Sequence, residues 1–276
     1  MPELPEVETV RRVLAPQLCG KRITGLIAVR PQVLAFPGAE QFRDGVVGTS
    51  FEAVDRRGKF LLFRLRNLRT LTVHLRMTGT LLIEPPENPV VKHTHVIVAL
   101  DDGRQLRFTD PRRFGRFWLT GAGEPDTVSG VHRLGIEPDD PRLTSAYLQR
   151  LFAGRRKAVK ECLLELSCIA GIGNIYSDEI LFAARIHPAR SAGSLSGGEW
   201  EVLAVVIPVV MAYYVEKNAI SPDDYLAGRG TDYRNTPFLN VYGRAGEPCR
   251  NCGTPLQRTV IGGRSSCFCP VCQKPG

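Results

Sequence analysis

Residues 249–272 read CRNCGTPLQRTVIGGRSSCFCPVC and contain two Cys-x-x-Cys pairs separated by 16 residues. Four thiolates in this arrangement suit tetrahedral zinc, and the two pairs typically face each other across a hairpin. Because four cysteines leave no open coordination position, the stretch predicts one structural zinc ion. The predicted ligands are Cys249, Cys252, Cys269 and Cys272. Cys267 is a fifth thiol beside the site; a register shift to it, a redox pair and a chance cluster stay open as alternatives.

The 120 residues at the start of the chain show the pattern of a β-rich domain with one helix. Apolar residues at helical spacing predict a helix over residues 5–18. From about residue 21 to residue 120 the apolar runs are short and alternating, and Asp102-Gly103 separates two of them as in a hairpin. This part predicts a β-sandwich or barrel.

Residues 121–142 are rich in Gly, Pro and Asp and predict a linker, after which the pattern becomes helical. Ala158–Leu166 is amphipathic, and a Gly-rich turn at 170–173 leads into a second helix from Asn174 to Ala184. Ser196 and Glu199 predict the capping box of a long helix that contains Pro208. The expected domains are therefore 1–120, 121–142, 143–240 and 241–276.

The charge balance favours a polyanionic partner. The chain of 276 residues carries 36 basic and 28 acidic residues, a net charge of +8. Residues 56–76 hold seven Lys or Arg and no acid, and residues 104–116 hold five against one. Arg155, Arg156, Lys157 and Lys160 form a third cluster, expected on a helix. Each run alone fits a solvated face, but three runs beside Phe60, Met77 and Phe114 favour a phosphate-tracking groove with apolar wedges.

The N-terminus offers a second kind of chemistry. Removal of Met1 would expose Pro2 as a secondary α-amine, which is neutral and nucleophilic in larger fraction than lysine at neutral pH. Its attack on a sugar C1′ gives an iminium ion that acts as an electron sink. Glu3 and Glu6 are placed to move protons, although they equally suit the start of a helix. The five histidines show no spacing that supports a catalytic metal or a Ser-His-Asp triad.

No secretory signal is expected, because the first ten residues carry three glutamates. The longest apolar run, Val202–Val215, has 14 residues, whereas a membrane span needs about 20. The sequence therefore predicts a soluble protein without a membrane partner.

Seven motifs together resemble the bacterial formamidopyrimidine-DNA glycosylase family over essentially the whole chain. They are MPELPEVETVRR at the start, RRGKF at 56–60, HLRMTG at 74–79, KHTH at 92–95, TDPRRFG at 109–115, GIGNIYSDE at 171–179 and VYGRAGEPCRNCGTPL…CPVC at the end. The resemblance implies an α+β protein: an N-terminal β-sandwich with flanking helices, a helical helix-two-turn-helix domain and a C-terminal zinc-finger β-hairpin. It also implies a monomer in the bacterial cytoplasm, acting on the nucleoid's damaged double-stranded DNA.

The resemblance also implies roles for individual residues. Pro2 would form a Schiff base at C1′ of the damaged nucleoside, with Glu3 as acid/base and Glu6 in support. Lys59 would assist β-elimination, and Arg264 the second, δ-elimination. Met77, Arg112 and Phe114 would fill the gap left by the extruded base. The further DNA contacts implied are His74, His93, Arg112, Arg156 and Asn174.

The lesion-reading segment departs from the family pattern. Residues 218–221 read Asn-Ala-Ile-Ser, where the family usually has Gly-Gly-Ser/Thr-Thr, and in relatives the region 218–237 covers the flipped base. The expected reaction is excision of 8-oxoguanine and formamidopyrimidines with strand cleavage. An endonuclease VIII-like enzyme for oxidised pyrimidines and a catalytically silent DNA-binding zinc protein are the alternatives, although Leu4 stands where the endonuclease VIII-like family typically has glycine.

Overall fold

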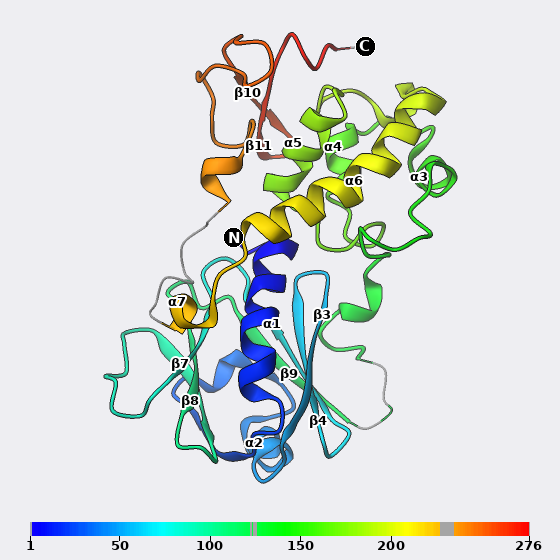
Figure 1. The fold of residues 1–276 in the computed structure, drawn as a ribbon. Helices are drawn as coiled ribbons and strands as arrows, with labels where there is room; N and C mark the ends of the chain where they lie inside the picture. The colour runs from blue at the N-terminus through cyan, green and yellow to red at the C-terminus, as the bar shows by residue number, and fades with distance from the viewer. Residues whose placement is uncertain (1, 122, 124–125, 227–234, 276) are drawn as a thin grey trace. The chain divides into compact units, whose positions relative to one another are not determined.

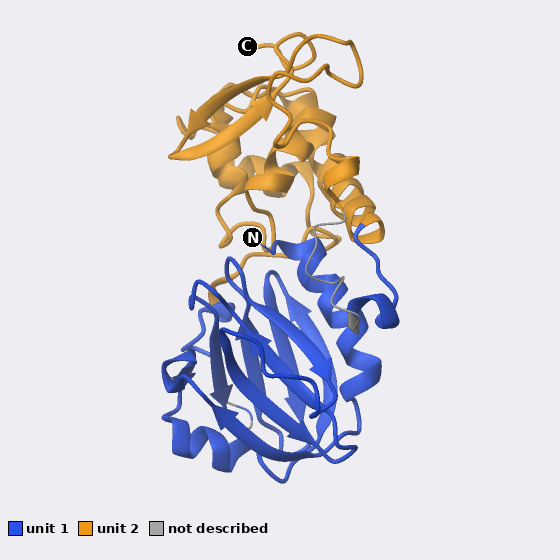
Figure 2. Ribbon diagram, turned by 90° about the vertical axis from the view of Figure 1, so that its left-hand side faces the viewer, with its two compact units in different colours: residues 1–132, 218–233 blue, residues 133–217, 234–276 orange. Residues whose placement is uncertain are grey.

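The computed structural model describes residues 2–121, 123, 126–226 and 235–275 (Figure 1). The chain divides into two compact units, the first formed by residues 1–132 and 218–233 and the second by 133–217 and 234–276 (Figure 2). The chain therefore passes from one unit to the other three times.

The first unit contains two β-sheets, as the alternating sequence predicts. The four-stranded sheet is antiparallel, in the order β1 (Ile23–Ala28), β7 (Thr94–Leu100), β8 (Gln105–Thr109) and β6 (Thr80–Glu84). The five-stranded sheet has the order β2 (Leu34–Phe36), β9 (Arg116–Thr120), β5 (Thr70–His74), β4 (Phe60–Leu65) and β3 (Phe51–Arg57). Only the β2–β9 pair in it is parallel. The predicted hairpin at Asp102-Gly103 connects β7 to β8.

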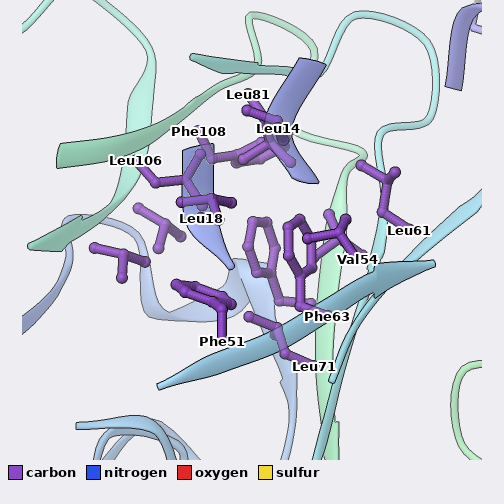
Figure 3. Close-up of a cluster of buried hydrophobic side chains, with 14 of the residues drawn as sticks. Leu14, Leu18, Phe51, Val54, Leu61, Phe63, Leu71, Leu81, Leu106 and Phe108 are labelled. Atoms are coloured by element: carbon purple, nitrogen blue, oxygen red, sulfur yellow. The ribbon is translucent and has the colours of Figure 1, made fainter. Parts of the chain in front are cut away.

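Apolar side chains from both sheets and from helix α1 (Leu4–Leu18) form one core. Figure 3 shows Leu14 and Leu18 of α1 beside Phe51 and Phe63 of one sheet and Phe108 of the other. The expected helix at 5–18 is thus confirmed, and its apolar stripe is the face that packs. Helix α2 (Ala39–Val46), the single turn η1 (Pro31–Val33) and the short helix α7 (Pro222–Leu226) complete this unit.

The second unit is helical and ends in a small hairpin. Its helices are α3 (Ser145–Phe152), α4 (Val159–Leu163), α5 (Asn174–Ala183) and α6 (Gly197–Lys217), and its hairpin pairs β10 (Gln257–Ile261) with β11 (Arg264–Phe268). The single turns η3 (Ala192–Ser194) and η5 (Thr236–Phe238) lie in the connections, and η2 (Val131–Arg133) stands at the boundary between the units. Gly262 and Gly263 form the hairpin turn with φ of 55° and 73°, which glycine adopts at low cost.

Two expectations for the helical part need correction. The helix expected over Ala158–Leu166 is shorter, because α4 spans Val159–Leu163. The basic residues 155–157 lie in the connection before it rather than on a helix. Lys160 does lie on α4, but it is fully buried, so it belongs to the interior of the unit and not to a basic surface.

The apolar length of one helix bears on the expectation that the protein has no membrane partner. Helix α6 has 21 residues, an 18-residue window with mean hydropathy of 1.5, and one third of that window buried. The helix is longer than the run of 14 apolar residues within it, because it begins at the predicted Ser196–Glu199 capping box, which the structure confirms. By length and composition alone, α6 is long and apolar enough to span a membrane. The core helix of a folded domain can be equally long and apolar, and α6 packs against α3 and α5.

Candidate active site

The start of α1 forms one side of a cavity of about 420 Å³ within the first unit. Pro2 and Glu6 both line it. Glu3 is the N-cap residue of the helix and is only 1% exposed, and its backbone N–H donates to Glu6 Oε2 at 2.7 Å. The two glutamates therefore cap the helix that presents Pro2, as the structural interpretation of these residues predicts.

The rest of the cavity wall comes from α1 itself, from the connection between β5 and β6, from the end of β8 and from the segment that returns from α6. Thr9 lies one turn further along α1, Met77 lies in the connection from β5 to β6, and Asn218 and Tyr225 lie on the segment that returns from α6. The volume is within the range of about 300–1,000 Å³ that small-ligand pockets occupy. The cavity thus has room for a group the size of a nucleobase next to the Pro2 amine.

Lys59 and His74 lie close together on the five-stranded sheet. Lys59 stands in the turn between β3 and β4, and only 6% of it is exposed. Burial, with the positive charges of Arg76 and Lys59 as smaller causes, lowers the pKa of His74 to about 3. His74 Nδ1 accepts a hydrogen bond from the Arg76 backbone N–H at 3.0 Å, and its ring stands edge-on to Phe60. At neutral pH His74 is therefore an uncharged ring in the free protein.

Of the wedge residues predicted from sequence, Met77 lies on one turn, and Arg112 and Phe114 lie on another. The buried carboxylate of Asp110 makes hydrogen bonds to both turns. Asp110 Oδ1 accepts from Thr78 Oγ1 at 2.5 Å and from the Arg112 backbone N–H at 3.2 Å, and its Oδ2 accepts from the Gly115 N–H at 2.8 Å. Thr78 follows Met77 directly, so Asp110 fixes both wedge turns relative to each other. Sequence reasoning missed this role, because Asp110 appeared only as one acid within a basic run.

The outer surface of these turns is cationic and aromatic. The Arg112 guanidinium carbon lies 5.0 Å from the centre of the Phe114 ring, and Phe114 is 49% exposed. His93 is half-buried, has a φ of 70°, and accepts a backbone hydrogen bond from the Asp110 N–H. Phe114 and Arg112 therefore form an exposed pair suited to contact with a base or a gap in a base stack.

The predicted residues of the second unit fall on α5, on the hairpin and on the connection before α4. Asn174 is the first residue of α5, and its Nδ2 donates to the Ser265 carbonyl at 3.0 Å. Arg264 opens β11 and is exposed, and Arg156 is exposed in the connection before α4. Asn174 therefore has a structural contact with the strand that carries Arg264, in addition to its predicted role at a phosphate.

A buried ion pair holds that strand on α5. Lys160 Nζ donates to Asp178 Oδ1 at 2.6 Å, and both side chains are inaccessible to solvent. The Asp178 carboxylate also accepts from Ser266 Oγ at 2.6 Å and from the Cys267 N–H at 2.9 Å. One carboxylate thus makes two of the hydrogen bonds that hold the strand of Arg264 on α5, and nothing in the local sequence pattern distinguishes it.

Glu179, the residue after Asp178 on α5, makes hydrogen bonds to the segment that leads into the cysteine-rich C-terminal residues. Glu179 is 1% exposed and accepts backbone hydrogen bonds from Asn240, Val241 and Tyr242, each at 2.9 Å. Its side chain also accepts from Tyr214 Oη at 2.6 Å. Two adjacent acids of one helix therefore fix two different parts of the C-terminal segment.

The sulfur atoms of Cys249, Cys252, Cys269 and Cys272 all lie within 4.8 Å of one another. Three of the pairs are separated by 3.5, 3.5 and 3.9 Å. Zinc bound to four sulfurs at about 2.3 Å requires separations of about 3.8 Å, so the cluster fits a tetrahedral ion. Cys267 packs into the small apolar cluster beside the site and is not one of the four, and the predicted register is the one the geometry supports.

Three family models cover most of the chain in order. The formamidopyrimidine-DNA glycosylase N-terminal domain matches residues 1–117, the H2TH domain of the same enzymes matches residues 134–224, and the zinc finger found in FPG and IleRS matches residues 246–275. These models fit the two-sheet unit, the helical unit and the four-cysteine cluster.

Full-length relatives agree with the family models. The chain is 45% identical to a formamidopyrimidine-DNA glycosylase of Symbiobacterium thermophilum, covering 99% of this chain and 89% of that one. It is 44% identical to the enzyme of the same name from Herpetosiphon aurantiacus, covering 99% and 100%. The fold matches Lactococcus lactis Fpg in complex with abasic-site DNA at a TM-score of 0.89, with 32% identity over 99% of this chain and 100% of that one.

The fold, the domain order and the zinc cluster define a helix-two-turn-helix DNA glycosylase of base excision repair. Within this class the chain belongs to the formamidopyrimidine-DNA glycosylase family.

Proposed function

We propose that the protein excises oxidised purines from double-stranded DNA and then cleaves the strand at the resulting abasic site. The observation that carries the proposal is the cavity beside Pro2, which Glu6 also lines and which lies at the helix that Glu3 and Glu6 cap. The solved Lactococcus lactis relative is in complex with DNA that contains an abasic site in one structure and Fapy-dG in another. The fold of this chain matches both structures over 99% of its length.

The proposed reaction begins with the Pro2 amine, once Met1 has been removed. The nitrogen attacks C1′, the bond from C1′ to the damaged base breaks, and the base leaves with a proton. The sugar then opens as O4′ takes up a proton, which Glu3 is placed to supply, and an iminium ion forms between Pro2 and C1′. Because a secondary amine gives an iminium with no N–H to lose, the positive charge stays available as an electron sink.

Strand cleavage follows by two eliminations. Loss of a C2′ proton sends electrons toward the iminium and expels the 3′ phosphate, and loss of the C4′ proton in a second elimination expels the 5′ phosphate. Water then hydrolyses the iminium and frees Pro2. We assign Lys59 to the first elimination and to holding a phosphate, and Arg264 to the second. Glu6 supports Glu3 through the hydrogen bond at the start of α1.

Extrusion of the base opens a gap in the duplex, which we assign to Met77, Arg112 and Phe114 to fill. Removing a base from the stack costs a few kcal/mol, and inserted side chains offset part of that cost. The link through Asp110 keeps the two wedge turns in one arrangement, so the side chains need little ordering when DNA binds. We also propose that His93, Arg156 and Asn174 contact the DNA backbone, together with His74 as a neutral donor.

The zinc ion has a structural role in this proposal. Cys249, Cys252, Cys269 and Cys272 would hold it, and its binding would stabilise a hairpin too small to have its own core. We further propose that the protein acts as a monomer in the bacterial cytoplasm.

Oxidised pyrimidines are a second candidate substrate class. The Lactococcus lactis relative is also known in complex with DNA containing an oxidised pyrimidine, at a TM-score of 0.90 and 33% identity. A panel of duplexes with 8-oxoguanine, a formamidopyrimidine, an oxidised pyrimidine or a preformed abasic site distinguishes the possibilities. We expect base release from both purine lesions and cleavage of the abasic strand. Binding without any cleavage would identify a silent DNA-binding protein, and release of pyrimidines alone would identify the endonuclease VIII-like alternative.

A further inference from the structure

The segment that follows α6 is bonded to α1 through a side chain that is a departure from the family pattern. Asn218 Nδ2 donates to Thr9 Oγ1 at 2.8 Å. The Thr9 hydroxyl in turn lies 3.2 Å from the Asn218 carbonyl oxygen and 3.0 Å from the Pro5 carbonyl oxygen, and it donates to one of them at a time. Both residues are 6% exposed, so water competes little for these groups.

Two more contacts hold the same segment, residues 218–225, on the first unit. Ile220 packs against the core between the sheets, and Tyr225 is buried in that core with its hydroxyl donating to the Leu81 carbonyl of β6. Between these contacts Ser221 caps the short helix α7, because its Oγ accepts from the Asp224 N–H at 3.1 Å. The segment is therefore fixed at both ends and ordered within.

The fixed segment forms part of the wall of the Pro2 cavity. Asn218 and Tyr225 line the cavity together with residues of α1, and Thr9, the partner of Asn218, lies on the same helix that presents Pro2. Neither Asn218 nor Ala219 is among the described residues with positive φ, so the path of this segment needs no glycine. An asparagine is tolerated here and supplies an amide that glycine lacks.

We propose that Asn218 is a positioning residue: its bond to Thr9 preforms the cavity wall against which the damaged base is held. The inference rests on the proposed function, since it takes the cavity to be the site of the base. A preformed wall lowers the ordering cost of base binding. It has no such effect on a substrate that lacks a base.

The test compares Asn218→Ala and Thr9→Val with wild type on two substrates. Loss of one buried hydrogen bond predicts a three- to tenfold rise in KM for 8-oxoguanine excision. Cleavage at a preformed abasic site is expected to change less than twofold. Thr9→Ser keeps the hydroxyl and is expected to restore wild-type values, and Ala219→Ser, at an exposed neighbour, serves as the matched control.

Amide hydrogen exchange tests the bond without any activity measurement. In Asn218→Ala the amides of residues 219–225 are expected to exchange three- to tenfold faster, while those of β4 and β7 stay protected and show that the unit is folded. Unchanged exchange would overturn the inference that Asn218 holds the segment. Faster exchange with an unchanged KM, or an equal loss on both substrates, would overturn its role toward the base. If wild type neither releases a base nor cleaves an abasic strand, the proposed function fails instead, and the exchange result still decides the contact.

Discussion

Replacing Asp178 by Asn should loosen the Arg264 hairpin from α5. The substitution keeps the shape of the side chain but removes the charge that neutralises Lys160, and both residues are inaccessible to solvent. Breaking a buried pair by removing one partner costs about 3–5 kcal/mol. An asparagine oxygen in the place of Oδ1 can still accept from Lys160 Nζ and Ser266 Oγ, but the amide nitrogen then replaces Oδ2 and leaves the Cys267 N–H without its acceptor.

The most direct assay is hydrogen exchange at the Cys267 amide, which donates to Asp178. Each 1.4 kcal/mol corresponds to a tenfold change in the opening equilibrium, so protection at this amide is expected to fall at least about a hundredfold. The proportion of product from the second elimination is expected to fall as well, because Arg264 starts the same strand.

A double variant separates charge from shape. Adding Lys160→Met to Asp178→Asn removes the unpaired ammonium, and it is expected to restore most of the protection because apolar replacement of a buried pair is often nearly neutral. The Ser265 carbonyl, which also accepts from Lys160, keeps Asn174 as a donor. Unchanged protection of the Cys267 amide in Asp178→Asn would refute the reasoning. Exchange at this amide as fast in the double variant as in the single one would also refute it.

Three further predictions concern the metal, the charge and the pH dependence. Cys249→Ser should lose zinc and DNA affinity together, whereas Cys267→Ser should keep one zinc per chain by metal analysis; loss of zinc from the latter would show that the ligand register is wrong. With three to five cationic contacts to phosphates, the logarithm of the DNA-binding constant should fall against the logarithm of salt concentration with a slope between about −3 and −5, and a slope near zero would contradict a phosphate-dominated interface. Because the pKa of His74 is about 3 in the folded protein, the unfolded state binds an extra proton between pH 6.5 and pH 3, so acid destabilises the fold through this residue. Between pH 6 and pH 4 the free energy of unfolding, measured by urea denaturation at each pH, should fall in His74→Asn by about 1.4 kcal/mol per pH unit less than in wild type. An equal fall in the two proteins would show that His74 is not the responsible group.

Local patterns were enough to predict the elements and the zinc site. The helix at α1, the alternation of the strands, the Ser196–Glu199 cap and the spacing of the cysteines all depend on residues close in sequence, and each appears in the structure. The long helix predicted after the Ser196–Glu199 cap is α6, and it is longer than the apolar run within it because the cap sets where it begins.

The residues that hold the site together could not be predicted in the same way. Lys160 was predicted to belong to a basic surface. It is buried instead, and its ammonium group pairs with Asp178, 18 residues away in the sequence. Thr9 and Asn218 are 209 residues apart, and their contact has no periodic signal in the chain. Such pairs are determined by tertiary packing, which a single sequence does not reveal. Residues 227–234 of the predicted lesion-reading region lie outside the described residues.

The central claim is that the amine of Pro2 becomes covalently bound to damaged DNA, and borohydride trapping tests it most directly. Reduction of the iminium ion converts it to a stable amine, so protein lacking Met1 is expected to form a covalent adduct with an 8-oxoguanine duplex. Pro2→Gly should lose most of the adduct, and protein that retains Met1 should form none. A strong adduct with protein that retains Met1 would contradict the claim.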